Sequence, residues 1–113
     1  MIADSVVQMI AGVAAQEVEG AQMGGGTARA VGGFLDSVTG DGGLTRGVSV
    51  EVGEVETAID LTMAVEYGRR IPRLLEEVRR NVINRVGSLV GLDVVEVNIT
   101  VNDVLLPEER SQL

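Results

Sequence analysis

The sequence predicts an α+β fold, a two-layer sandwich in which helices pack on one face of a small, mostly antiparallel sheet. Apolar and polar residues alternate over residues 48–65 and 95–101, as is typical of half-buried strands, whereas residues 71–89 carry apolar side chains at helical spacing. The chain of 113 residues is long enough for one compact domain. We therefore expect residues 1–104 to form a single domain and residues 105–113 to form a flexible tail.

The first predicted helix covers residues 5–18. It begins here because Asp4 and Ser5 are both good helix N-caps, and Gly20 prevents it from continuing. Glu17 falls on the same side of this helix as the residues expected to be buried, since successive residues are about 100° apart around the axis. The apolar residues that we expect to face the core are Val6, Ile10, Val13 and Ala14.

The segment 20–47 is rich in glycine, with ten of the fifteen glycines of the chain. The clusters at 24–26 and 40–43 have the glycine content of phosphate-binding loops, but a Walker loop needs a lysine and the chain contains none. We interpret both clusters as hinges that permit positive φ. Between them, a short amphipathic helix is predicted over residues 27–38 from the spacing of Ala30, Val31, Phe34, Leu35 and Val38.

The clearest strand pattern is an antiparallel hairpin with one buried face. Valines at 48, 50 and 52 alternate with Ser49 and Glu51, a turn follows at Gly53, and the alternation resumes over residues 57–65. A last half-buried strand is predicted over residues 92–104.

The second predicted helix lies between the hairpin and the last strand. Pro72 suits the first turn of a helix, where its missing N–H costs nothing, and Gly91 suits the position just after the end. The continuous apolar stripe expected to face the sheet consists of Ile71, Leu74, Leu75, Val78, Val82, Val86 and Leu89.

The composition excludes several kinds of chemistry. The chain has no histidine and no cysteine, so it lacks the usual proton shuttle, the thiolate nucleophile and the usual zinc ligands. Aromatic residues make up only 2%, and the formal net charge is −8, which disfavours both base stacking and attraction to phosphate. We therefore expect no catalytic, cofactor-binding or metal-binding residues and no cofactor, and the net charge disfavours a nucleic-acid partner.

No apolar run approaches the length of a membrane span, and no signal peptide is present at the start of the given sequence. We therefore expect a cytoplasmic protein without direct membrane insertion.

Charge is segregated along the chain. Residues 48–68 hold five acidic residues and no basic one, while residues 69–87 hold six arginines and two glutamates, a local charge of +4. Three of the arginines crowd the start of the second predicted helix, where the helix dipole disfavours cations. A candidate interaction face is formed by Arg69, Arg70, Arg73 and Arg80, and a candidate complementary acidic face is formed by Glu51, Asp60 and Glu66.

The unfavourable position of these arginines can be offset in more than one way. One way is intramolecular, through the neighbouring acidic hairpin and an ion pair between Glu76 and Arg80 at i, i+4. Another is intermolecular, with the arginine face of one subunit against the acidic sheet of a second subunit or of an acidic partner protein. Binding to nucleic acid is a third, less favoured explanation.

Two charged residues occupy positions inside the predicted apolar stripes. Glu17 lies on the buried side of the first helix and Arg85 lies in the stripe of the second. A charge at such a position usually reaches outward or finds a partner. We therefore predict a structural ion pair between Glu17 and Arg85 where the two helices pack side by side; the alternative is that both lie at the edges of their faces.

Ordered blocks of residues carry a family resemblance over almost the whole chain, from Ile2 to about Val104. They are IAD at 2–4, IAGVAA at 10–15, EVEG at 17–20, LTRGV at 44–48, VEVGE at 50–54, VEYG at 65–68, IP at 71–72 and GLDVVEVN at 91–98. In this order the blocks resemble the alkaline shock protein 23 family of Gram-positive bacteria, also called the general stress protein 24 family.

The resemblance implies a non-enzymatic cytoplasmic protein of the cell-envelope stress response. It further implies a small membrane-anchored protein as a partner and a location near the membrane through that partner. The charge segregation described above adds self-association, with a second copy as a partner. The family has no established catalytic residues, so none is carried over. The alternatives are a small-ligand-binding or carboxylate-based enzyme domain that uses Tyr67, and an RNA-binding module.

Overall fold

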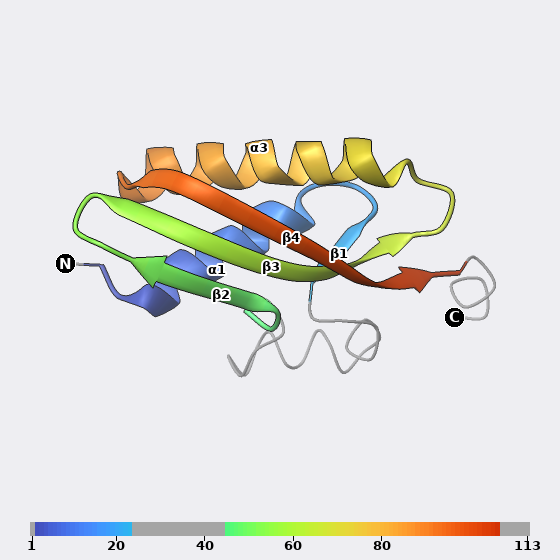
Figure 1. Ribbon diagram of the computed structural model, residues 1–113, viewed down its shortest axis with the longest axis horizontal. Coiled ribbons are helices and arrows are strands. Elements are labelled where there is room, and N and C mark those ends of the chain that lie inside the picture. Colours follow the sequence, from blue (N-terminus) through green and yellow to red (C-terminus); the bar gives the residue numbers. More distant parts are fainter. Residues whose placement is uncertain (1, 24–44, 107–113) are drawn as a thin grey trace.

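The computed structural model describes residues 2–23 and 45–106. Both helices lie on one face of a single sheet, so the predicted α+β sandwich is confirmed (Figure 1). The helix expected over residues 27–38 lies outside the described residues, as does most of the expected tail. In chain order the elements are α1 (Asp4–Gln16), β1 (Ala21–Met23), β2 (Val48–Val52), β3 (Glu56–Glu66), α3 (Ile71–Val90) and β4 (Asp93–Leu105).

The sheet is built around β3, which has neighbours along both of its edges. β4 runs parallel to β3 along its whole length on one edge. On the other edge, β2 and β1 pair with β3 end to end and antiparallel, with Val48 opposite Leu61 and Met23 opposite Met63. The parallel pairing follows from the chain path, because α3 carries the chain back before β4 begins.

The core lies between the sheet and the two helices and is almost wholly aliphatic. The one fully buried polar side chain among the described residues is Thr57, whose hydroxyl donates a hydrogen bond to the Glu51 carbonyl at 2.9 Å. Both helices reach the same cluster, which explains why the strands need only one apolar face. Its fully buried members include Val7, Ala11, Ala15, Ile59, Leu61, Met63, Val78, Val82 and Val86.

The predicted start and buried face of α1 are wrong. The N-cap is Ala3, which makes no side-chain hydrogen bond, and Asp4 lies in the first turn. Of the residues expected to be buried, Val6 and Val13 are exposed, and only Ala14 is fully buried. The helix presents its small residues to the core instead, because these let its backbone come close to both α3 and the sheet. The buried residues of α1 are Val7, Ala11, Gly12, Ala14 and Ala15.

The predictions for α3 and β4 agree more closely with the structure. Pro72 lies in the first turn of α3, and Gly91 ends the helix in the left-handed conformation with φ of 83°. The stripe is buried along its middle, but Ile71 and Leu89 at its two ends are exposed. β4 ends at Leu105, one residue beyond the predicted boundary, and Leu105 is buried.

Candidate protein interaction surface

Four of the six arginines at residues 69–87 are already engaged within the chain. Arg69 lies just before α3, and its guanidinium contacts Glu66 at 3.3 Å and Glu19 at 3.5 Å. Its side chain passes directly over Gly20, where a Cβ atom would lie 2.9 Å from the Arg69 Nε. The acidic hairpin therefore does offset one of the arginines at the start of α3, as the intramolecular explanation requires.

The expected ion pair between Glu76 and Arg80 is not formed. Glu76 contacts Arg79 instead, at 3.7 Å and a spacing of i, i+3. The Arg79 Nε also donates a hydrogen bond to the Val97 carbonyl of β4 at 3.3 Å, which holds this guanidinium on the sheet side of the helix within reach of Glu76. Spacings of three and four residues are equally close on a helix, so sequence spacing alone cannot choose between them.

The arginine face that remains is small and fully solvent-facing. Arg73 contacts Glu77 at 3.8 Å, but the Arg73 side chain is 78% exposed, so this ion pair is weak. Arg70 and Arg80 are exposed and make no ion pair with any other described residue. Arg80 lines an open depression together with Glu17, Glu77 and neighbouring asparagines. The unneutralised positive charge of α3 is thus concentrated at Arg70 and Arg80, with Arg73 close by in sequence between them.

The structure divides the predicted acidic face into two parts. Glu51 and Asp60 both lie on the outer face of the sheet, away from the helices, and both are exposed. Asp60 accepts a hydrogen bond from the Asn98 side-chain amide at 2.9 Å, and the same amide donates to Glu96 at 2.8 Å. Glu66 instead contacts Arg69. Of the three residues of the predicted acidic face, Glu51 and Asp60 therefore remain available to a positively charged partner.

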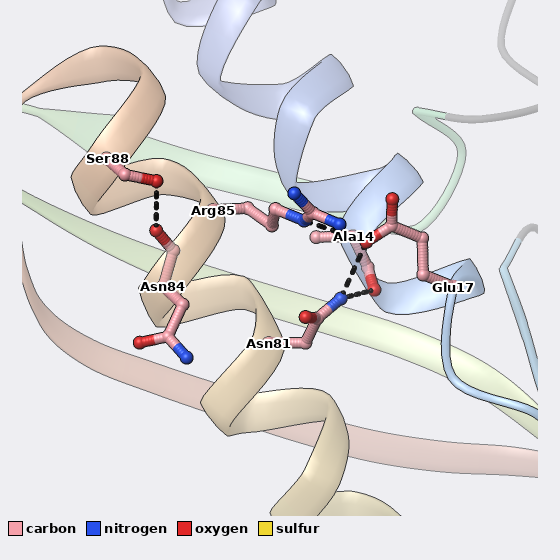
Figure 2. Close-up of polar contacts among 6 residues, drawn as sticks. All are labelled: Ala14, Glu17, Asn81, Asn84, Arg85 and Ser88. Carbon is pink, nitrogen blue, oxygen red and sulfur yellow. Dashed lines mark hydrogen bonds and ion pairs between the residues drawn. The ribbon is translucent and has the colours of Figure 1, made fainter.

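The structure brings Glu17 and Arg85 together at the seam between α1 and α3 (Figure 2). The Arg85 Nε lies 3.0 Å from Glu17 Oε1. Asn81 lies one turn before Arg85 and donates from its side-chain amide to the same Glu17 oxygen at 2.8 Å and to the Ala14 carbonyl at 2.7 Å. Carbonyl groups in the last turn of a helix lack partners within the helix. Asn81 therefore both caps the end of α1 and fixes its position against α3.

The contacts at the seam lower the pKa of the Glu17 carboxyl group. The hydrogen bond from Asn81 is the largest cause, followed by the hydrogen bond from Arg85. Both donors favour the charged form, so Glu17 is ionised at neutral pH. A carboxylate held in this way is suited to joining two helices and poorly suited to donating a proton in catalysis.

The lowered pKa predicts that Glu17→Gln makes the stability of the protein less sensitive to acid. A depressed carboxyl pKa contributes stability above its unfolded-state value, and this contribution is lost as the pH falls through the folded-state value. Wild type should therefore have the higher Tm at pH 7, and its advantage over Glu17→Gln should disappear between about pH 5 and pH 3. Thermal unfolding followed by circular dichroism across this pH range measures the difference in Tm between the two proteins. A Tm difference that does not change with pH would contradict the assignment.

Asn81 is a structural position at the seam that the sequence pattern did not reveal. It carries no charge and lies at the edge of the predicted apolar stripe, where a polar residue is ordinary. The one available signal is its spacing of four residues from Arg85, which places both side chains on the same flank of α3.

Over the two described stretches, 2–23 and 45–106, no group of three acidic residues is arranged to hold a metal ion. In the same stretches no helix combines the length and the apolar character needed to cross a bilayer. Tyr67, the aromatic residue considered for an enzyme, is 65% exposed on the turn after β3.

The comparisons with known proteins identify a family and relatives that are similar in sequence. The sequence model of the alkaline shock protein 23 family matches residues 1–106, and this family is described as having a cell envelope-related function. No solved structure gives a significant match.

Two kinds of curated relative are similar in sequence. A protein of Streptococcus pyogenes serotype M1 named stress response regulator gls24 homolog is 31% identical over 110 residues, which cover 94% of this chain and 58% of the relative. The protein YqhY of Bacillus subtilis, described as uncharacterized, is 32% identical over 99 residues, which cover 87% of this chain and 70% of the relative. The chain thus spans little more than half the length of its streptococcal relatives.

Proposed function

Because the chain belongs to the alkaline shock protein 23 family, whose function is related to the cell envelope, we propose that it is a non-enzymatic protein interaction module of the envelope stress response. It acts in the cytoplasm by self-association and by docking on a small membrane-anchored protein, which places it near the membrane. The observation that carries the proposal concerns the predicted interaction residues: Arg70 just before α3, Arg80 on α3, and Glu51 and Asp60 on the outer face of the sheet make no ion pair with any other described residue.

Self-association brings these two surfaces together. The arginines lie on the exposed side of the helical layer, and the acidic residues lie on the opposite face of the same domain. One copy can therefore present its positive surface to the negative surface of the next. Complementary charges of this kind steer association and fix its register.

The non-enzymatic part of the proposal is supported by the state of the Glu17 carboxyl group. The hydrogen bonds from Asn81 and Arg85 lower its pKa and keep it ionised. Acid–base catalysis at neutral pH needs a pKa near 7, which for a carboxyl group requires a shift in the opposite direction.

We predict that self-association weakens when Arg80 is replaced by glutamate. The charge reversal places like charges opposite each other, so the dissociation constant should rise at least about tenfold. Sedimentation velocity at several protein concentrations measures this change, and raising the salt concentration should weaken wild-type association as well, because exposed charges are screened.

A charge swap provides the control for this experiment. Asp60→Arg alone should also weaken association, whereas Asp60→Arg combined with Arg80→Glu should regain part of it. Unchanged sedimentation of wild type in high salt and of Arg80→Glu in low salt would together exclude this mode of self-association.

Docking on a membrane-anchored protein needs a separate test. Crosslinking in the native cells with membranes retained should recover one small membrane protein with the wild-type chain and much less of it with Arg70→Glu combined with Arg80→Glu. Recovery of soluble metabolic enzymes alone would count against this part of the proposal.

A further inference from the structure

A second candidate surface lies at the end of the molecule where three elements meet. α1 begins there, α3 ends there and the turn between β2 and β3 lies beside them (Figure 1). These elements surround a cavity of about 550 Å³, a size typical of sites that take a small ligand or a few side chains of a partner. The cavity shares no lining residue with the depression beside Arg80.

The walls of the cavity are largely apolar. Three of the apolar lining residues contact or belong to the main core cluster. They are Val52 at the end of β2, Val90 at the end of α3, and Leu92 just before β4. Ile2 forms a further side and is partly exposed. Because three of the four apolar walls are fixed by the core, the cavity exists before anything binds in it.

The cavity is also negatively charged. Asp4 and Glu54 line it, neither forms an ion pair within the described part of the chain, and no lining residue is basic. Asp4 offsets the positive end of α1, in whose first turn it lies. Glu54 has no such compensation, and the nearby C-terminal end of α3, whose last turn contains no basic residue, adds negative partial charge.

The turn that lines the cavity also exposes an apolar side chain. Val55 follows Glu54 in this turn and is 70% exposed. Exposed apolar surface next to a preformed cavity is typical of a site that binds a partner.

We propose that this cavity binds a segment of a partner protein that presents an arginine or lysine beside apolar side chains. The basic group lies between Glu54 and the C-terminal end of α3, and the apolar side chains contact Val52, Val90 and Leu92. The sign of the charge excludes an anionic ligand. The inference rests on the proposed role as a protein interaction module and names the chemistry of one partner surface.

The test uses two synthetic peptides with blocked ends, one of alternating leucine and arginine and one in which glutamate replaces each arginine. Each is titrated to millimolar concentration into ¹⁵N-labelled protein, and amide shifts are followed by NMR. The arginine peptide should shift the amides of Gly53, Gly91 and Leu92, and the glutamate peptide should not. Absence of shifts at these amides with the arginine peptide would overturn the proposal.

Matched charge reversals test the role of Glu54. Glu54→Arg should weaken binding of the arginine peptide at least about tenfold. Asp103→Arg changes the net charge equally, but Asp103 is exposed and lies opposite Ala64, at the other end of β4 from Leu92, so binding should stay within about twofold of wild type. Equal weakening by both substitutions would show attraction to net charge alone and would also overturn the proposal.

The same spectra distinguish a second copy of the chain as the occupant. If dilution of the protein without peptide moves the amides of Gly53, Gly91 and Leu92, the cavity is filled by another copy and the assignment to a different partner is wrong. Failure of peptide binding while Arg80→Glu still disrupts self-association would remove this inference and leave the proposed function standing.

Discussion

Replacing Ile59 by alanine should lower the free energy of unfolding by about 3 kcal/mol. Ile59 lies at the centre of β3, where β2 and β4 pair with it on both sides, and its side chain is 0% exposed. Its apolar neighbours come from both helices and from the sheet, so the removed atoms leave a cavity that the surroundings can fill only in part. Urea unfolding followed by circular dichroism measures the change.

Two further variants make this prediction specific. Ile59→Val removes a single methylene and should cost about 1 kcal/mol. Val55→Ala removes apolar atoms from a side chain that is 70% exposed and should change stability by less than about 0.5 kcal/mol. Similar losses for Ile59→Ala and Val55→Ala would show that β3 is not the centre of the core.

Gly47→Ala should destabilise the fold by about 3 kcal/mol, although glycine and alanine differ by one methyl group. The φ of Gly47 is +84°, which L-residues avoid at a cost of roughly 1 to 2 kcal/mol, and a Cβ atom here would lie 2.6 Å from the Thr62 carbonyl oxygen. The clash would push apart the two strands at the point where the Thr62 amide donates to the Gly47 carbonyl at 2.8 Å. Losing that hydrogen bond adds about 1 kcal/mol.

Gly68→Ala separates the two contributions. The φ of Gly68 is +97°, but no heavy atom lies within 4 Å of the position where its Cβ would be. Only the cost of a positive φ for an L-residue applies, so this substitution should lower the free energy of unfolding by about 1 to 2 kcal/mol. An equal loss of stability in both variants, measured by urea unfolding, would show that the contact with Thr62 plays no part.

Much of the fold could be predicted from the sequence because its pattern is strong where the elements are half-buried. Apolar and polar residues alternate cleanly in the hairpin and β4, and α3 has a continuous apolar stripe that ends before Gly91. The existence, type and order of these elements were therefore predictable. The parallel direction of β4 has no signature in its own residues. It follows from the length of α3 and is a property of the chain path.

The buried face of α1 could not be predicted from periodicity because its apolar residues extend around most of the helix. Valines at positions 6, 7 and 13 point in different directions, and hydrophobicity alone does not rank them. What selects Val7 is the close approach of the helix to its neighbours through small residues, which a pattern based on hydrophobicity undervalues. The Glu17 and Arg85 contact was predictable because a charge inside an apolar stripe is locally anomalous, whereas Asn81 presents no such anomaly.

The surfaces were harder to predict than the elements. The local charge of +4 at residues 69–87 overstated the positive surface, because the fold brings carboxylates from outside this segment to Arg69 and Arg85. The cavity at the end of α3 combines residues near positions 2, 53 and 91, whose proximity depends on the complete packing of the domain. Neither the extent of the positive surface nor the position of the cavity can be predicted from a single stretch of sequence.

The end-to-end placement of β1 and β2 makes one edge of β3 the common template for two strands that are far apart in the sequence. Met23 and Val48 pair with Met63 and Leu61, which are only two residues apart on β3. The relative position of β1 and β2 is therefore set by the register of β3. Because side chains alternate between the two faces of a strand, a slip of β3 by one residue would turn the core-facing partners of both strands to the outer face at the same time.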